Sequence, residues 1–203
     1  MDELLKFVKL TQEFRAVRRR IVSSREGREE NDSEHSYQLA MVAWYLVNTQ
    51  NLSLNLPLVI KYALTHDLVE IYAGDTPAAM HKGFEKEQST KHEREEVAAK
   101  KLKEEFPEFP EMHELIANYE IRSDPESRFV YALDKVIPLL DIYLDDGYSW
   151  KVHKVSLEDL VSSKIDKVAV SPEVEKYFDE IVGILESKQD TLFPVAKAEE
   201  KSL

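Results

Sequence analysis

Apolar residues recur at the spacing of an α-helix along most of this chain, and no long stretch alternates in the manner of a β-strand. The first segment shows the pattern, since Leu4, Leu5, Val8, Phe14 and Val17 lie near helical spacing. Glycine, a poor helix former, accounts for only 5 of the 203 residues. The sequence therefore predicts an all-α protein.

Polar caps, prolines and a glycine divide the pattern into a bundle of about eight helices. Asp32 or Ser33 can cap the second helix, and Pro57 suits the first turn of the third. Gly74 and Pro77 then interrupt the chain. Residues 23–32 are expected to form a loop, and the expected helices cover residues 2–21, 33–48, 57–71, 84–105, 111–122, 125–147, 156–168 and 172–186.

The length and charge of the chain limit what it can bind. Its 203 residues are enough for one domain with a sizeable core, and no linker divides them. We expect a single domain over residues 1–187 and a flexible tail over residues 188–203. The formal net charge of −12 argues against a surface for duplex nucleic acid, which needs a basic patch. A small phosphate ester can still bind to a local group of arginines.

Missing residue types exclude other classes of protein. The chain has no cysteine, which excludes a disulfide, a thiolate nucleophile and a cysteine-based zinc site. No apolar stretch approaches the 18 residues of a transmembrane segment, and the N-terminus does not resemble a signal peptide. We expect a cytoplasmic protein without a membrane partner.

Ionisable residues gather at the end of the third expected helix. His66 and Asp67 follow the largely apolar run 58–64, where charged groups are unusual. Glu70 lies on the same helical face as this pair, and Asp75 follows soon after. Clustered titratable groups indicate a functional site, although a helix end that reaches solvent explains the His-Asp pair equally well.

Two further residues favour the functional interpretation. His35 lies in the first turn of the second helix, and Asp134 stands among apolar residues of the long helix 125–147. A lone buried carboxylate is costly, so Asp134 needs a partner or a metal ion. Two imidazoles and two carboxylates make a site for one divalent ion, such as Mn, Co, Fe, Ni, Zn or Mg, on His35, His66, Asp67 and Asp134.

Short motifs that include these residues occur in a fixed order across residues 5–145. They are Glu34-His35-Ser36, His66-Asp67-Leu68-Val69-Glu70, Ala73-Gly74-Asp75-Thr76-Pro77 and Ala132-Leu133-Asp134-Lys135. The set resembles the signature of HD-domain metal-dependent phosphohydrolases, and within them the bacterial 5′-deoxynucleotidase branch. The resemblance implies an HD-domain fold, one metal ion on the four ligands, hydrolysis of a (deoxy)nucleoside 5′-monophosphate, and a homodimer.

The same resemblance assigns roles around the metal. Arg20, fifteen residues before His35, would orient the phosphate, and Arg25 would match a second arginine of the family. Independently of the resemblance, Glu70 shares a helical face with the ligands and would accept the proton of the attacking water or orient that water, and Asp75 would contact the sugar or protonate the leaving oxygen. Asp67 and the turn Asp75-Thr76-Pro77-Ala78 would line the substrate site. Ile21 stands where the family has a tryptophan, and Ala78 where the best-known branch has a hydroxyl residue.

Several alternatives accompany these assignments. Arg18 and Arg19 are interpreted as a basic helix end that complements the helix dipole. Trp44 and Tyr45 are expected in the core. A two-metal site, a phosphodiesterase, a triphosphate hydrolase and a non-catalytic metal- or nucleotide-binding module remain open; additional ligands for a second metal would come from His81, His92, His113 and His153.

Overall fold

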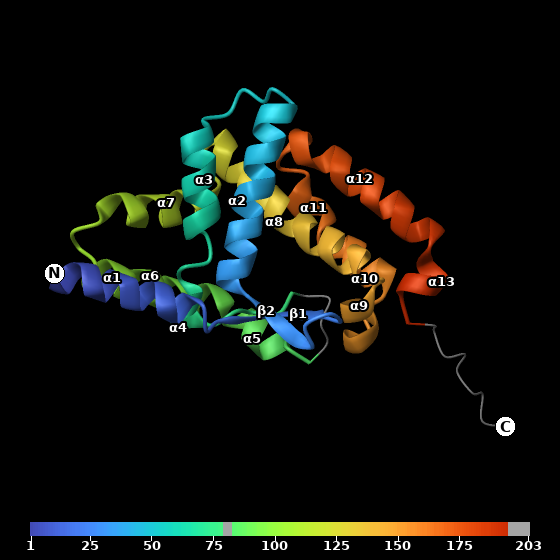
Figure 1. Ribbon diagram of the computed structural model, residues 1–203, viewed down its shortest axis with the longest axis horizontal. Helices are drawn as coiled ribbons and strands as arrows, with labels where there is room; N and C mark the ends of the chain where they lie inside the picture. Colours follow the sequence, from blue (N-terminus) through green and yellow to red (C-terminus); the bar gives the residue numbers. More distant parts are fainter. Residues whose placement is uncertain (79–82, 195–203) are drawn as a thin grey trace.

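The computed structural model describes residues 1–78 and 83–194, which form a helical body with one small β-hairpin (Figure 1). The predicted all-α class is confirmed. No helix within the described ranges is long and apolar enough to cross a membrane. The elements are α1 (Asp2–Phe14), β1 (Arg18–Ser23), β2 (Arg28–Asn31), α2 (Asp32–Thr49), α3 (Leu56–Thr65), α4 (Glu70–Ala73), α5 (Glu85–Ser89), α6 (Lys91–Glu105), α7 (Pro110–Ile121), α8 (Pro125–Leu144), α9 (Tyr148–His153), α10 (Leu157–Ser162), α11 (Ile165–Val168), α12 (Pro172–Ser187) and α13 (Gln189–Leu192).

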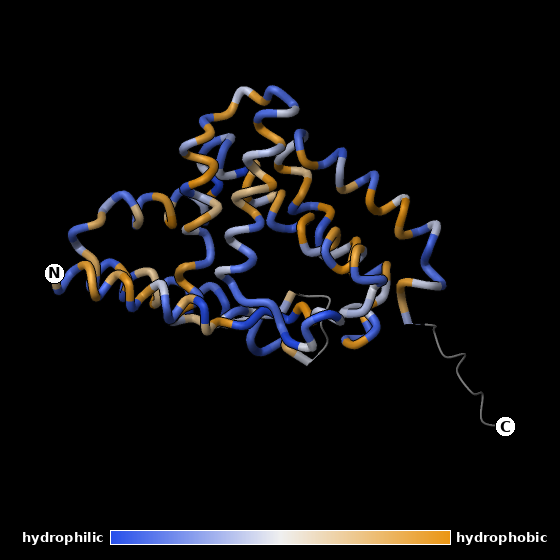
Figure 2. The backbone as a smooth tube through the Cα atoms, viewed as in Figure 1, coloured by the Kyte–Doolittle hydropathy of each residue, from blue (hydrophilic) through white to orange (hydrophobic). Residues whose placement is uncertain are grey.

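The long helix α8 lies at the centre of the main hydrophobic core. Asp124 caps its N-terminus and Pro125 occupies the first turn, where a missing N–H costs nothing. Helices α2, α3, α7, α11 and α12 pack against it (Figure 1). Hydrophobic and hydrophilic residues recur in turn along each long helix, as expected of amphipathic helices that pack around a shared core (Figure 2).

A second, smaller core joins α1, α6 and α7. It contains Leu10 from α1, Leu102 from α6 and Met112 from α7. Leu68 and Val69, in the turn between α3 and α4, also belong to it, whereas Tyr62 and Ala63 at the end of α3 belong to the main core. The His66-Asp67 pair therefore lies where the chain passes from one core to the other.

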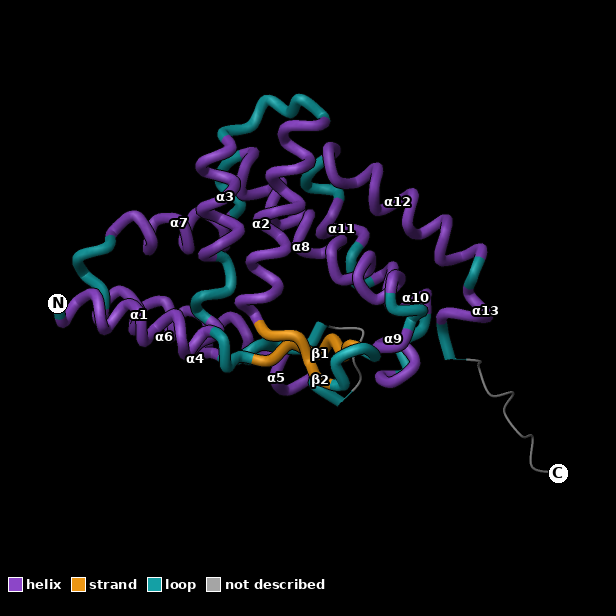
Figure 3. The backbone as a smooth tube through the Cα atoms, viewed as in Figure 1, coloured by secondary structure: helices purple, strands orange, loops and turns teal. Residues whose placement is uncertain are grey.

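The structure corrects the sequence prediction between residues 15 and 31. Helix α1 ends at Phe14 rather than near residue 21, and the expected loop is partly an antiparallel hairpin (Figure 3). Gly27 has a positive φ of 64° and closes the turn, with its N–H donating to the Ser23 carbonyl. Arg18, Arg19 and Arg20 have no acidic residue one helical turn away to pair with, so a helix gains no ion pairs from them. In a strand their side chains point alternately to opposite faces, which separates neighbouring charges.

The remaining differences concern boundaries and exposure. Three expected helices are each divided in two: 57–71 into α3 and α4, 84–105 into α5 and α6, and 156–168 into α10 and α11. The short helices α9 and α13 were not expected. The predicted tail begins too early, since Phe193 is buried and stacks on Trp150 with 4.7 Å between ring centroids. Residues 195–203 lie outside the described part. Trp44 and Tyr45 are not in the core: they are 51% and 64% exposed on α2.

Candidate metal centre

The four predicted ligands come together from three parts of the fold. His35 lies in the first turns of α2, which a capping box between Asn31 and Glu34 starts. His66 and Asp67 form the turn after α3, and Asp134 lies midway along α8. One ligand atom from each of the four lies within 4.8 Å of all the others. Metal–ligand bonds of about 2 Å place ligands on opposite sides of an ion about 4 Å apart, so the cluster has the size of a metal site.

The ring of His66 is oriented for a metal ion. Its Nδ1 donates a hydrogen bond to the Ala63 carbonyl over 3.0 Å, which leaves Nε2 facing the carboxylates. Nε2 is 2.9 Å from Asp67 Oδ2, yet it is buried and makes no aligned hydrogen bond. A lone pair facing a carboxylate oxygen is unfavourable unless a cation lies between them. This orphaned nitrogen is the observation that fits a divalent ion best.

The charges of the ligands also suit a cation. Burial lowers the pKa of His35 to about 4, helped by the Arg19 charge, so its ring is neutral near pH 7. Its Nε2 is 2.7 Å from Asp134 Oδ1. Burial alone would raise the pKa of Asp67, but the His66 ring and Arg19 hold it well below the usual range. His35 thus offers a neutral imidazole and Asp67 a charged carboxylate, the forms that bind metal. Burial opposes protonation of His66, but the Asp67 and Asp134 charges outweigh burial and raise its pKa, so a metal ion would displace a proton from this ring.

Arg19, rather than Arg20, reaches this cluster. Its Nη1 donates to Asp67 Oδ2 over 2.6 Å, and its Nη2 is 3.8 Å from Asp134 Oδ1. Although burial opposes its charge, Asp67 and Asp134 raise the pKa of Arg19 well above its usual value. The interpretation of Arg19 as a basic helix end was wrong, because the residue lies on β1 and not in a helix.

Arg20 points elsewhere, since successive side chains of a strand alternate in direction. Its guanidinium lies 3.7 Å from Glu29 and stacks over the Phe84 ring, and 41% of its side chain is exposed. It still lines the cavity beside the metal cluster. The predicted role of Arg20 depended on its spacing of fifteen residues from His35. A spacing in sequence does not say which of two adjacent side chains faces the cluster, and the hairpin register is irregular between Arg18 and Val22.

Two buried acids stand next to the ligands. Glu70, the first residue of α4, is 4% exposed, and burial together with Asp67 raises its pKa well above the usual value. Asp32, which was considered only as a helix cap, is fully buried, and burial followed by the Asp67 charge raises its pKa to about 7. Oxygens of Asp32, Asp67 and Glu70 lie within 4.8 Å of one another.

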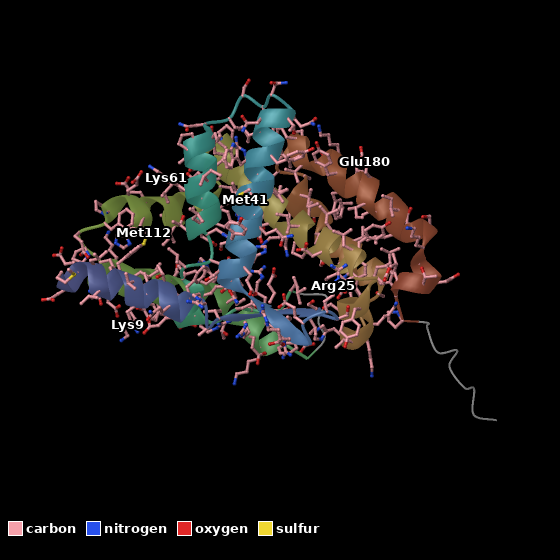
Figure 4. The ribbon with its side chains drawn as sticks, in the orientation of Figure 1. Lys9, Arg25, Met41, Lys61, Met112 and Glu180 are labelled. Atoms are coloured by element: carbon pink, nitrogen blue, oxygen red, sulfur yellow. The ribbon has the colours of Figure 1, made fainter. Side chains whose placement is uncertain are left out.

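A cavity of about 330 Å³ opens beside the ligands. Asp67, Asp134 and Glu70 line it, together with the predicted substrate residues Ile21, Asp75, Thr76, Pro77 and Ala78. Thr76 accepts a hydrogen bond of 2.6 Å from Arg94, which orients its hydroxyl. Arg25 is not part of the cavity: it lies exposed in the turn between β1 and β2 (Figure 4).

Sequence reasoning missed four lysines of the same cavity. They come from α6, α8, the α10–α11 connection and α11, and they are Lys91, Lys135, Lys164 and Lys167. In the sequence Lys91 opens a charged run, Lys164 and Lys167 each follow a polar or charged residue, and Lys135 follows the ligand Asp134. Only their inward orientation distinguishes them from lysines in solvent.

The other histidines do not join the metal cluster in the part of the chain that the structure describes. His92 pairs with Glu96 at 3.2 Å on the exposed face of α6. The His113 ring binds the Phe106 carbonyl at 2.8 Å. His153 belongs to neither group of potential ligands. His81 lies outside the described residues.

Known proteins share this fold and much of this sequence. The model of the HD domain family matches residues 11–175. The human protein named 5′-deoxynucleotidase HDDC2 is 31% identical over 98% of this chain and 92% of its own, and the zebrafish (Danio rerio) protein of that name is 27% identical over 92% and 86%. The crystal structure of a predicted metal-dependent phosphohydrolase from Magnetospirillum magnetotacticum superposes with a TM-score of 0.77, at 28% identity and 94% coverage of both chains. The family model spans most of the chain and includes all four clustered ligands, so this chain belongs to the HD domain family.

Proposed function

We propose that this chain is a metal-dependent phosphohydrolase that converts (deoxy)nucleoside 5′-monophosphates to nucleosides and phosphate. The observation that carries the proposal is one cavity lined by the ligands Asp67 and Asp134, an arginine and a buried glutamate. Its volume of about 330 Å³ lies in the range of small-molecule sites. The relatives named 5′-deoxynucleotidase support the substrate class.

His35, His66, Asp67 and Asp134 would hold one divalent ion of the group Mn, Co, Fe, Ni, Zn and Mg. When bound, such an ion supplies Lewis-acid polarisation of a phosphoryl oxygen and of water. Once Asp67 binds an ion, its charge is shared, and the Arg19 Nη1 that now donates to Asp67 would be available to phosphate oxygens, while Glu30 and Asp32 still hold the guanidinium in place. A planar guanidinium suits this task because it can bind two phosphate oxygens at once.

Proton transfer falls to the two cavity carboxyls. Glu70, buried beside Asp67, would accept the proton of the attacking water once a bound cation offsets the Asp67 charge that helps to raise its pKa. Asp75 lies on the turn after α4 and lines the cavity next to Thr76 and Pro77. From there its carboxyl would contact the sugar and protonate the leaving oxygen. Ile21 and Ala78 would supply apolar contact to the nucleoside, and Arg20 would contribute charge rather than a direct phosphate bond.

A screen of phosphate esters with Mn²⁺ or Co²⁺ tests the proposal. We expect release of inorganic phosphate from nucleoside 5′-monophosphates, and loss of about 100-fold or more in kcat when Glu70→Gln removes the proton acceptor. Glu180→Gln is the matched control, because Glu180 is exposed on α12, far along the chain from the site (Figure 4). Pyrophosphate or triphosphate release without any monophosphate turnover would contradict the substrate class.

We further propose a homodimer through α2, in the cytosol. Four large side chains, Tyr37, Met41, Trp44 and Tyr45, lie on one face of this helix and are 43–66% exposed. Exposed apolar patches of this kind mark interaction surfaces, and a twofold axis would bury the patch against its own copy. Trp44→Glu should convert the dimer to a monomer in light scattering after gel filtration. A wild-type monomer at micromolar concentration would contradict the proposal.

A further inference from the structure

Lys164 is a buried lysine on the wall of the cavity. It stands just before α11 and is only 5% exposed. Within residues 1–78 and 83–194 its ammonium group forms no hydrogen bond and no ion pair, yet the residue lines the cavity beside the metal ligands. Burying an unpaired charge is expensive, so a lysine here costs stability that an apolar residue of similar length would not.

The surroundings of Lys164 are positively charged. Burial and the charge of Lys135 lower the pKa of Lys164 to about 7, while Asp134 opposes that shift and Lys167 and Arg19 add to it. Lys135 itself contacts the Asp134 carboxylate. Lys167, one helical turn beyond Lys164, also lines the cavity and has no carboxylate partner among the described residues.

The balance of charge changes when a divalent ion occupies the proposed site. Two positive charges would neutralise the carboxylates of Asp67 and Asp134. Those carboxylates are now partners of Arg19 and Lys135. The charge of Lys135 would then no longer be compensated by Asp134, and Arg19 would keep Glu30 and Asp32 as partners. Together with Lys164 and Lys167, Arg19 and Lys135 make this cavity cationic. A phosphate monoester, which carries up to two negative charges near pH 7, complements that charge.

We propose that Lys164, assisted by Lys167, binds the phosphate group that is hydrolysed, from the α10–α11 wall of the cavity. This inference rests on the proposed phosphohydrolase function and adds a phosphate-binding residue from the C-terminal third of the chain. Arg19 approaches the phosphate from β1, and Lys164 from a different wall. The two cations hold the phosphate in place while the ligand cluster stays unchanged.

Binding of inorganic phosphate, the expected product, tests the proposal without requiring turnover. The full chain loaded with Mn²⁺ is titrated with phosphate in a calorimeter, as wild type, Lys164→Met and Lys167→Met. Methionine keeps the length of the side chain and removes the charge. We expect Lys164→Met to weaken phosphate binding about tenfold or more, and Lys167→Met to weaken it less. Lys100→Met is the control, because that side chain is 79% exposed on α6.

The measurements distinguish a failure of the Lys164 inference from a failure of the proposed hydrolase function. Unchanged phosphate affinity in a folded, Mn²⁺-loaded Lys164→Met protein would overturn the inference. If that variant does not fold, unchanged affinity in Lys167→Met would overturn it instead. A protein that hydrolyses no nucleotide but loses phosphate affinity in Lys164→Met would contradict the proposed function alone. In an active enzyme, Lys164→Met should raise KM for the nucleotide more than it lowers kcat.

Discussion

Replacing Arg19 by methionine should nearly abolish hydrolysis, whereas the same change at Arg20 should have little effect. The Arg19 side chain is 14% exposed and lies within 4 Å of four carboxylates. The Arg20 side chain is 41% exposed, and the one carboxylate paired with it among the described residues, Glu29, is 3.7 Å away. The two neighbours thus provide a matched pair that differs in orientation but not in chemistry.

The expected magnitudes follow from these environments. Loss of one preorganised charge-stabilising donor in a buried site costs about 100- to 1,000-fold in turnover, and Arg19→Met should fall in this range. An exposed ion pair contributes about 1 kcal/mol at most, which is about fivefold. Arg20→Met should therefore reduce kcat/KM by about fivefold or less.

Stability provides a second measurement on the same variants. Removing one partner of a buried ion pair costs about 3–5 kcal/mol, because the carboxylates of Asp32 and Asp67 would stay buried without Arg19. The metal-free Arg19→Met protein should melt well below wild type in calorimetry, and Mn²⁺ should restore part of the loss by neutralising Asp67. A larger loss of activity in Arg20→Met than in Arg19→Met would refute the assignment.

Further predictions follow from the metal ligands, the buried lysine and the C-terminal packing. His66→Ala should lose bound Mn²⁺, measured by metal analysis after dialysis; full retention of the ion would contradict the ligand set. Lys164→Met should raise the melting temperature more at pH 6 than at pH 9.5. The reason is that its pKa of about 7 in the folded protein lies below the ordinary 10.5, so the burial penalty is complete below pH 7 and fades as the pH rises toward 10.5. Equal gains at both pH values would contradict this. Gly147→Ala should destabilise by more than about 2 kcal/mol in urea unfolding, because a Cβ would lie 2.2 Å from the Leu192 carbonyl oxygen and φ is +71°. Gly183→Ala, with free space inside α12, should stabilise by about 0.5–1 kcal/mol.

Three of the four ligands were accessible from sequence because they interrupt an apolar pattern. His66 and Asp67 follow the largely apolar helix α3, and Asp134 stands between buried residues of α8. His35, in the polar segment 33–36, was placed with them by its position in the ordered motifs. A polar residue at a core position has few explanations, and the period of a helix fixes which neighbours share its face. The helices themselves were predictable for the same reason, although the short ones such as α4 and α13 were not.

The hairpin escaped prediction because both of its strands are polar. Arg18–Ser23 and Arg28–Asn31 carry charged residues on both faces, so they show no alternation of apolar and polar residues. Only the β-branched pair Ile21-Val22 and the nearby Gly27 indicate a strand and a turn. The hairpin also determines which arginine reaches the metal ligands, since the direction of an arginine side chain depends on whether the residue lies on a helix or a strand.

Arg19 and Lys164 show how differently buried charges relate to stability. Two apolar cores hold the fold, and neither requires a cation at these positions. Arg19 has carboxylate partners, so its removal should reduce stability and activity together. Lys164 has none among the described residues, so its removal should increase stability while phosphate affinity falls. A charge whose loss stabilises the fold has no structural reason to be retained there, and such a residue is explained by a ligand that brings the opposite charge.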